Sequence, residues 1–266
     1  MKLRGAAVLI TGASSGIGAA TALRFAREHA RLAICARRLD RLHEVAEKCR
    51  QAGAEAVIVR RTDVSRPAEV RAFVAGALRD FDRVDVLVNN AGLGWRGRFE
   101  RMPEEEIQQL LGTNLVGLAV ATQAVLPAML ELNRGVIINV ASVVGFRAVP
   151  YSAFYSATKH AVAGLSHALR GELSGTGVKV CAVYPGTTDT EFFGRDDRGP
   201  MMVSSDWVAR AVVRTARWPR RDVIIAPYRL AQLVEPVLGG PLDHLIGEYR
   251  RRKDPRLAPP VPQHPA

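Results

Sequence analysis

The sequence has little cysteine, few aromatic residues and no long uninterrupted apolar run. Three cysteines stand far apart among 266 residues, at Cys35, Cys49 and Cys181, without the paired spacing of a zinc site or a disulfide framework. This usage is typical of a reducing compartment. No apolar run approaches the roughly 20 residues that a membrane span needs, and the first apolar run begins at Ala6, which leaves no room for a signal peptide. We therefore expect a soluble, cytoplasmic protein.

Negative charge is also scarce, because the formal net charge is +11. Such a charge would suit nucleic acid, an anionic membrane or a polyanionic substrate. However, no run of lysine and arginine is interleaved with stacking aromatic residues, and arginines such as Arg24, Arg71 and Arg79 are spread over expected solvated helix faces. We predict no nucleic-acid partner.

Apolar runs rich in β-branched residues alternate with helical periodicity through most of the chain. The expected strands are 6–10, 32–35, 56–59, 84–88, 136–140, 178–183 and 223–226. The expected helices are 18–29, 39–52, 67–80, 104–131, 155–174 and 205–216. Strands that are apolar on both faces require helices on both sides. The pattern predicts an α/β, Rossmann-like, doubly wound parallel sheet of about seven strands.

A glycine-rich turn, Thr11-Gly12-Ala13-Ser14-Ser15-Gly16-Ile17-Gly18, lies between the first strand and the first helix. Its spacing is G-x-x-x-G-x-G rather than G-x-G-x-x-G. Gly12 permits a sharp turn, Gly16 permits close approach of a pyrophosphate, and Gly18 permits close helix packing. We expect a dinucleotide to contact Gly12, Ser14, Ser15, Gly16, Ile17 and Gly18.

The second strand ends in Arg37-Arg38 rather than in a carboxylate. An acidic residue at this place would bond the ribose 2′-hydroxyl of NAD, whereas arginine accommodates a 2′-phosphate. We therefore predict NADP(H) in preference to NAD(H), with Arg37 as the main contact and Arg38 as a stacking or second contact. The alternative is two solvated arginines at the start of the next helix.

Two polar segments follow the third and fourth strands. Asp63-Val64 could reach an adenine edge, or Asp63 could cap the helix that begins near Pro67. The segment Asn90-Ala91-Gly92 could line the cofactor crevice, or it could be an ordinary turn.

Three side chains form a candidate reaction centre. Ser142 follows the fifth strand, and Tyr155 and Lys159 stand four residues apart on the next helix, where they share one face. A nearby ammonium favours the phenolate, so we expect it to lower the pKa of Tyr155 from about 10 toward neutrality. Tyr155 is then a candidate general acid for a carbonyl oxygen, with Ser142 as a second hydrogen-bond donor. An exposed helical pair is the alternative.

Together these motifs resemble the compact single-domain branch of the short-chain dehydrogenase/reductase family, from residue 5 to about 228. The matching positions are Thr11 to Gly18, Asp63, Asn89 to Gly92, Asn114, Ser142, Tyr155, Lys159, Pro185, Gly186 and Thr190. The resemblance implies hydride transfer between the nicotinamide and a carbonyl or alcohol carbon.

The resemblance also assigns roles that the residues alone do not. It implies catalysis by Ser142, Tyr155 and Lys159, with Asn114 helping to hold a proton-relay water; on its own, Asn114 would be a polar residue interrupting a long helix. It implies that Lys159 reaches the nicotinamide ribose. It implies that the segment with Pro185, Gly186, Thr188 and Thr190 borders the nicotinamide. A homo-oligomer, dimer or tetramer, through helices 104–131 and 155–174 is usual in the family.

Three segments are expected to determine the substrate: 92–99, 145–154 and the stretch after Pro185. They carry mostly apolar side chains, which predicts a hydrophobic ketone, aldehyde or alcohol. The residues concerned are Leu93, Trp95, Phe146, Val149, Tyr151, Phe192, Phe193, Met201 and Met202. We expect 195–199 to be the tip of a mobile lid.

The chain beyond the catalytic domain (1–228) is expected to form an extension, 229–253, and a disordered tail, 254–266. Pro236, Gly239, Gly240 and Pro241 predict that the extension consists of at least two short pieces. It could cap the substrate pocket, pack on a partner subunit or contact a membrane surface through its basic end, and we rank these roles in that order.

Two other function classes are weighed against an enzyme of this kind. One is a catalytically silent module that senses NADP(H), against which the complete set Asn114, Ser142, Tyr155 and Lys159 argues. The other is an epimerase or dehydratase on a related fold, whose glycine spacing and larger C-terminal region this chain does not share.

Overall fold

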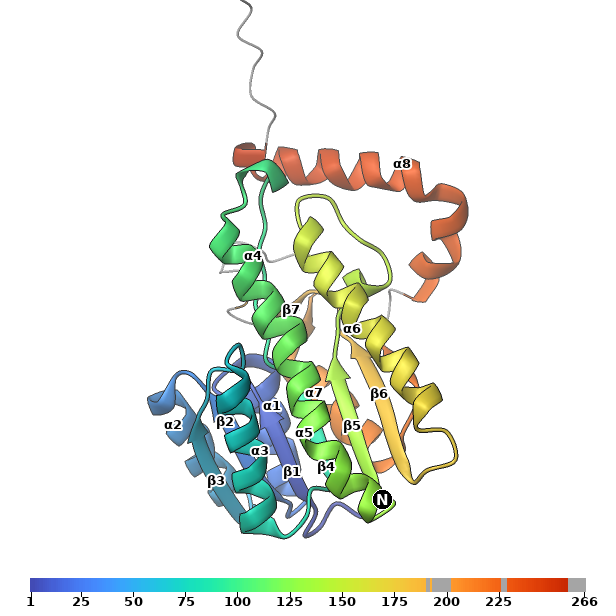
Figure 1. Cartoon of the computed structure of the whole chain (residues 1–266). Coiled ribbons are helices and arrows are strands. Elements are labelled where there is room, and N and C mark those ends of the chain that lie inside the picture. The colour runs from blue at the N-terminus through green and yellow to red at the C-terminus, as the bar shows by residue number, and fades with distance from the viewer. Residues whose placement is uncertain (190–191, 193–201, 226–228, 258–266) are drawn as a thin grey trace, which may run out of the picture.

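A computed structural model describes residues 1–189, 192, 202–225 and 229–257. Seven parallel strands form one sheet in the order β3-β2-β1-β4-β5-β6-β9 (Figure 1). The strands are β1 (Ala7–Thr11), β2 (Arg31–Ala36), β3 (Ala56–Arg61), β4 (Val86–Asn89), β5 (Gly135–Val140), β6 (Val178–Tyr184) and β9 (Asp222–Ile224). The predicted doubly wound parallel sheet is confirmed.

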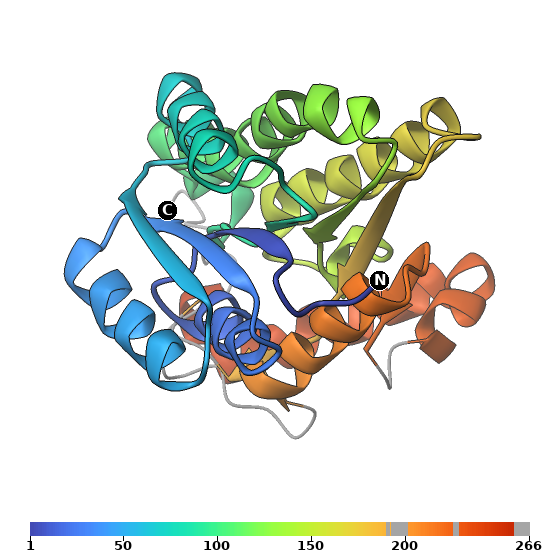
Figure 2. The same cartoon turned by 90° about the horizontal axis from the view of Figure 1, so that it is seen from below.

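Helices cover both faces of the sheet. The principal ones are α1 (Gly16–Arg27), α2 (Leu39–Gln51), α3 (Pro67–Phe81), α4 (Glu104–Leu111), α5 (Gly117–Glu131), α6 (Ala153–Glu172) and α7 (Ser205–Arg217). Helices α1, α2 and α7 bury Phe25, Leu42 and Val212 against one face, and α3 and α5 bury Phe73 and Val125 against the other (Figure 2). The two layers of core explain why the strands are apolar throughout.

The topology also places the site. Strand β1 pairs with β2 on one side and with β4 on the other. The chain therefore winds from β1 toward β3 in one direction and from β4 toward β9 in the opposite direction. In such sheets a crevice opens beyond the carboxyl ends of the two strands at this switch point. The segments that follow β1, β4, β5 and β6 meet at that edge.

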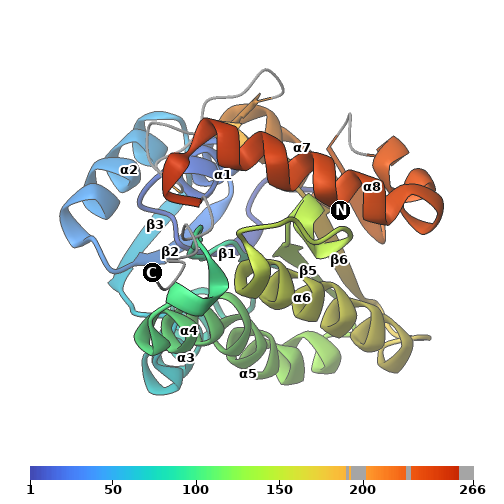
Figure 3. The ribbon, with the colours of Figure 1, turned by 90° about the horizontal axis from the view of Figure 1, so that it is seen from above.

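The C-terminal extension differs from its prediction. Residues Arg229–Lys253 form one helix, α8, which bends near its start and runs across the carboxyl edge of the sheet (Figures 1 and 3). The prediction of separate pieces is wrong. Proline removes a single helical hydrogen bond and can bend a helix without ending it.

Two short strands were not predicted. Strands β7 (Thr188–Asp189) and β8 (Val203–Ser204) pair with each other outside the main sheet.

After α8, the chain forms a 3₁₀ turn, η6 (Pro255–Leu257), in which Leu257 is buried. The prediction of a disordered tail is therefore wrong for these three residues. Residues 258–266 and the expected lid tip, 195–199, lie outside the described residues.

One helical stretch is long and apolar enough to cross a membrane by length and composition, Glu104–Glu131. It is not one continuous apolar run, because uncharged polar residues such as Thr122 and Gln123 interrupt it. It comprises α4, a π-helical turn η2 (Gly112–Val116) and α5. Half of its apolar window is buried in the fold, where Val125 and Met129 join the core beside α3. This is how a core helix packs.

Candidate functional site

A cavity of about 430 Å³ opens at the carboxyl edge of the sheet. Its wall includes nearly all the residues predicted to contact a cofactor. These are Gly12, Ser14, Ser15, Gly16, Ile17, Arg37, Arg38, Asp63, Val64, Asn90, Ala91, Gly92, Tyr155, Lys159, Pro185, Gly186 and Thr188. The topology thus brings together segments from most of the chain.

The glycine turn needs its glycines for two different reasons. Gly12 and Gly16 have φ angles of +68° and +53°, in the left-handed region. A Cβ on Gly12 would lie 2.7 Å from Ala91 Cα, and one on Gly18 would lie 2.3 Å from Gly12 O. Gly18 is not one of the described residues that line the cavity. Its lack of a side chain lets α1 pack on the turn. The N-terminus of α1 consequently faces the cavity and suits an anion.

Arg38 is tied to the glycine turn. Its Nη2 donates to Ser15 Oγ (2.6 Å) and Ser14 Oγ (3.3 Å). Ser15 precedes α1 but its side chain does not cap that helix. Arg37 is exposed and stands close enough to Asp63 to lower its pKa. Both guanidiniums therefore flank one end of the cavity, where a phosphate can be held.

Asp63 lines the cavity and does not cap a helix. Burial would raise the pKa of Asp63, but hydrogen bonds from Ser65 and the nearby Arg37 outweigh burial and hold the pKa below its usual value. Asp63 Oδ1 accepts from Ser65 N (3.0 Å) and Ser65 Oγ (2.7 Å). The N-cap position of α3 is occupied by Arg66, whose side chain makes no capping hydrogen bond, so the capping interpretation of Asp63 is wrong.

The end of β4 is fastened to the end of β1. The backbone N of Asn90 donates to Thr11 Oγ1 (3.0 Å), and its Nδ2 donates to Thr11 O (3.0 Å) and Gly12 O (3.1 Å). These bonds hold the glycine turn against the segment that carries Ala91 and Gly92. An ordinary exposed turn would not need them.

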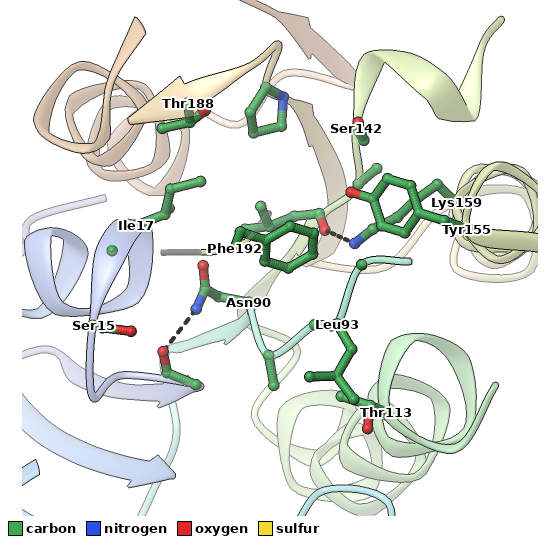
Figure 4. A pocket seen from close by; sticks show the side chains of 18 of the residues that line it. Ser15, Ile17, Asn90, Leu93, Thr113, Ser142, Tyr155, Lys159, Thr188 and Phe192 are labelled. Atoms are coloured by element: carbon green, nitrogen blue, oxygen red, sulfur yellow. Dashed lines mark hydrogen bonds between the residues drawn. The ribbon is translucent and has the colours of Figure 1, made fainter. Parts of the chain in front are cut away.

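The three candidate reaction residues meet in this cavity (Figure 4). Ser142 follows β5, whereas Tyr155 and Lys159 extend from α6, and Tyr155 hydrogen-bonds the Ser142 side chain. Lys159 Nζ lies 5.9 Å from the centroid of the Tyr155 ring. All three are buried, with at most 9% of each residue exposed. The exposed-pair alternative for Tyr155 and Lys159 is therefore wrong.

The pKa of Tyr155 departs from its prediction. Burial raises it to about 12, and the hydrogen bond from Ser142 only partly opposes this shift. The Lys159 ammonium, expected to lower this pKa, donates instead to Val140 O at 3.0 Å. Tyr155 is therefore a phenol across the physiological range and can donate a proton.

Burial lowers the pKa of Lys159 from 10.5 to about 8. Below this pH the folded protein holds a buried ammonium, which costs free energy of folding. Between about 8 and 10.4 the unfolded chain still binds the proton while the folded chain has released it. The contribution of Lys159 to stability therefore rises with pH across that window.

Replacing Lys159 with methionine should isolate this contribution. We expect Lys159→Met to be more stable than the wild type at pH 7, by at most about 3 kcal/mol. The difference should shrink as pH rises from 8 to 10. Urea unfolding of both proteins at each pH measures it, and the titration of the buried cysteines cancels in the comparison. A difference that does not change with pH would contradict the assignment.

Asn114 does not line the cavity. It lies in the π-helical turn η2, where Oδ1 accepts from Leu93 N (2.7 Å) and Nδ2 donates to Leu93 O (2.9 Å) and Thr158 Oγ1 (3.1 Å). Its side chain thus fixes the segment after β4 and contacts the neighbour of Lys159 on α6. Asn114 does interrupt the helical stretch, as its sequence context indicated.

The segment after β6 completes the cofactor side of the cavity. Pro185, Gly186 and Thr188 line it, and Thr188 Oγ1 donates to Gly186 O at 3.0 Å. Thr190 lies outside the described residues. Phe192 packs against Tyr155, with ring centroids 5.7 Å apart.

The remaining wall is only partly as predicted. Leu93, Val149 and Phe192 line the cavity, but Trp95, Tyr151 and Met202 do not. Phe146 stacks instead on Tyr184, with centroids 3.8 Å apart. Phe193 and Met201 lie outside the described residues.

Other residues that were not singled out from the sequence also line the cavity. Gly94, Arg96, Ser152 and Thr187 belong to the three segments expected to determine the substrate, whereas Thr62, Thr113, Val140, Val143, Val144 and Arg250 lie outside those segments. The most consequential are Arg96, from the segment after β4, and Arg250, from α8. Arg250 belongs to the extension for which capping of the substrate pocket was the first-ranked role, and its position at the cavity agrees with that role. Its place there depends on how α8 runs across the edge of the sheet.

Known proteins resemble this chain through most of its length. The family described as short chain dehydrogenase matches residues 6–199. An uncharacterized oxidoreductase of Staphylococcus saprophyticus is 41% identical over 186 residues, which are 69% of this chain and 74% of that protein. The ketoacyl reductase HetN of Nostoc is 34% identical over 230 residues, 84% of this chain and 79% of that protein.

Solved structures agree in fold. An alcohol dehydrogenase from the archaeon Thermococcus sibiricus, complexed with 5-hydroxy-NADP, is 33% identical with a TM-score of 0.76, and the match covers 82% of this chain and 94% of that one. A short chain dehydrogenase/reductase from Burkholderia phymatum, in complex with NAD, is 27% identical with a TM-score of 0.81, covering 98% and 99%. Nicotinamide cofactors of both kinds thus occur among the neighbours.

Proposed function

The chain belongs to the short-chain dehydrogenase family, and from this premise we propose that it is an NADP(H)-dependent oxidoreductase that reduces a hydrophobic ketone or aldehyde. The observation that carries the proposal is the convergence of Ser142, Tyr155 and Lys159 in one cavity with the glycine turn. The named ketoacyl reductase among the relatives supports a carbonyl substrate.

The residues of the cavity fit a nicotinamide dinucleotide. Gly12 and Gly18 let the turn and α1 pack closely against each other and against the segment after β4, and the N-terminus of α1, which faces the cavity, suits a pyrophosphate. Arg37 and Arg38 would hold a 2′-phosphate by charge-assisted hydrogen bonds. Lys159 lines the cavity on the opposite side, where it would hold the nicotinamide ribose.

The chain's own residues supply the proton chemistry. Bound NADPH supplies a hydride from nicotinamide C4. Ser142 donates a hydrogen bond to the substrate carbonyl oxygen, and the Oη of Tyr155 gives its proton to that oxygen as negative charge develops there. The Lys159 ammonium then stabilises the phenolate. Burial of all three groups strengthens these interactions.

The proposal is tested by measuring consumption of NADPH and NADH with a panel of hydrophobic ketones and aldehydes. We expect turnover with a KM for NADPH below that for NADH. Arg37→Ala should raise the KM for NADPH about 10- to 100-fold, the usual effect of losing a charge-assisted hydrogen bond. The KM for NADH should change little, because NADH lacks the 2′-phosphate.

Arg41→Ala is the matched control, since Arg41 lies on α2 near the same region but does not line the cavity. It should leave both KM values unchanged. Equal use of the two cofactors, or an unaffected Arg37→Ala variant, would argue against the NADP(H) preference. Binding of NADPH without turnover of any carbonyl would favour the cofactor-sensing module.

We also propose a homo-oligomer that acts in the cytoplasm. The family resemblance supports contacts through α4, α5 and α6. The exposure of Leu130 on α5 and Val116 just before it is consistent with such a contact. These side chains are large and apolar, and burial against a second copy would remove them from water.

A further inference from the structure

The substrate end of the cavity carries positive charge among apolar side chains. Arg96 and Arg250 line it beside Leu93, Val149 and Phe192. Among the described lining residues the one carboxylate is Asp63, which stands beside Arg37 at the opposite, cofactor end. Guanidiniums in the wall of a cavity favour an anionic group on the molecule that occupies it.

Arg250 is held firmly at this place by the fold. Its Nη1 donates to Pro150 O (2.6 Å) and Ser152 Oγ (3.2 Å) in the segment between β5 and α6. In the same segment, Tyr151 Oη accepts a hydrogen bond from Arg251 Nη1 (3.1 Å). Helix α8 crosses the carboxyl edge of the sheet (Figure 3). The hydrogen bonds of Arg250 fix its guanidinium at the cavity.

The turn that receives Arg250 is itself constrained. Tyr151 has a φ of +63°, an uncommon left-handed conformation for a bulky residue, and Gly97 N donates to Tyr151 O at 2.9 Å. Such strain persists where surrounding contacts determine it and is concentrated at ligand sites. The segment carrying Arg96 and the helix carrying Arg250 are thus both bonded to one turn.

Arg250 and the reacting group line the same cavity. Ser152, which contacts Arg250, directly precedes α6, and Tyr155 follows three residues later. Ser152 and Tyr155 both line the cavity, so a group bound by Arg250 would share this space with the reacting carbonyl.

Arg96 stands near a carboxylate outside the cavity. It is one of the groups that lower the pKa of Asp254, after the hydrogen bonds from Arg256, and Asp254 does not line the cavity. Hydrogen bonds to Pro150 and Ser152 fix Arg250 at the cavity wall, which makes it the better positioned of the two to bind an anion.

We propose that the substrate is amphipathic: a carbonyl compound with an apolar body and an oxyanion, a carboxylate or a phosphate, which Arg250 binds with the help of Arg96. A guanidinium presents two parallel donors that match either oxyanion. This inference rests on the proposed reductase function and narrows its substrate class.

The test compares charged and neutral substrates of one shape. The probes are 4-oxo and 5-oxo acids of six to ten carbons, their methyl esters, and keto-alcohol phosphate monoesters, each with NADPH. We expect the wild type to use an acid or a phosphate about tenfold or more better than the ester, measured as kcat/KM. Whichever anion is preferred identifies the source of the oxyanion.

Variants then assign the preference to Arg250. Arg250→Gln should lower kcat/KM for the anionic substrate about 10- to 100-fold and leave the ester nearly unchanged. Arg250→Lys keeps the charge and should recover part of the loss. Arg252→Gln is the matched control, because Arg252 is on the same helix but is exposed and paired with Glu248. It should change neither substrate.

The possible results distinguish an error in the proposed substrate class from an error in the proposed reductase function. Equal use of acid and ester by the wild type would overturn the inference while leaving the reductase proposal intact. Equal loss of both substrates in Arg250→Gln would do the same, since Arg250 would then only hold the loop. Failure to reduce any carbonyl would refute the reductase function itself.

Discussion

Tyr155→Phe should retain NADPH binding and lose turnover. The phenol is the proton donor of the proposed reaction, and a positioned general acid contributes about 10²- to 10⁴-fold to the rate, so kcat should fall by that factor. The substitution removes one oxygen and keeps the ring that packs against Phe192. Steady-state kcat, together with NADPH binding followed by fluorescence, measures the two properties separately.

The control for this variant is Tyr249→Phe, because Tyr249 is exposed on α8 and does not line the cavity. It should leave both turnover and binding unchanged. Undiminished turnover in Tyr155→Phe would remove Tyr155 from the mechanism. Loss of NADPH binding in that variant would mean that the hydroxyl supports the cofactor rather than the chemistry.

Local sequence patterns were sufficient for the parts of the site that local geometry determines. The turn between β1 and α1 could be predicted because left-handed backbone at Gly12 and close packing at Gly18 both select glycine. Tyr155 and Lys159 share a helix face because they are four residues apart. Their place in the cavity follows from the doubly wound parallel sheet, which the alternating pattern predicted, although the pattern did not give the order of the strands.

Properties that depend on burial and on distant contacts could not be predicted in the same way. The pKa of Tyr155 moved opposite to the expected direction because burial outweighs a lysine that donates to a backbone carbonyl. Asn114 does not line the cavity, and its amide bonds the backbone of Leu93 instead. The position of Arg250 depends on a helix whose prolines and glycines suggested a break.

Gly18→Ala should damage both the fold and the cofactor site. The added Cβ would lie 2.3 Å from Gly12 O and 2.5 Å from Asn90 Nδ2. Neither atom can move freely, because Asn90 Nδ2 donates to Thr11 O and Gly12 O. Relief of the clash must displace the glycine turn from β4. We expect a loss of about 1–3 kcal/mol in unfolding free energy and a decrease of about tenfold or more in NADPH affinity.

The same substitution at Gly164 distinguishes this packing effect from a general effect of alanine. Gly164 lies within α6, and a Cβ there meets no atom within 4 Å. Gly164→Ala should therefore stabilise the protein by about 0.5–1 kcal/mol, since alanine is the better helix former, and leave NADPH binding unchanged. Urea unfolding and NADPH titration of both variants measure the contrast. If Gly18→Ala matched the wild type in both, the glycine turn would tolerate a side chain, and the close approach of α1 would not explain why glycine stands at that position.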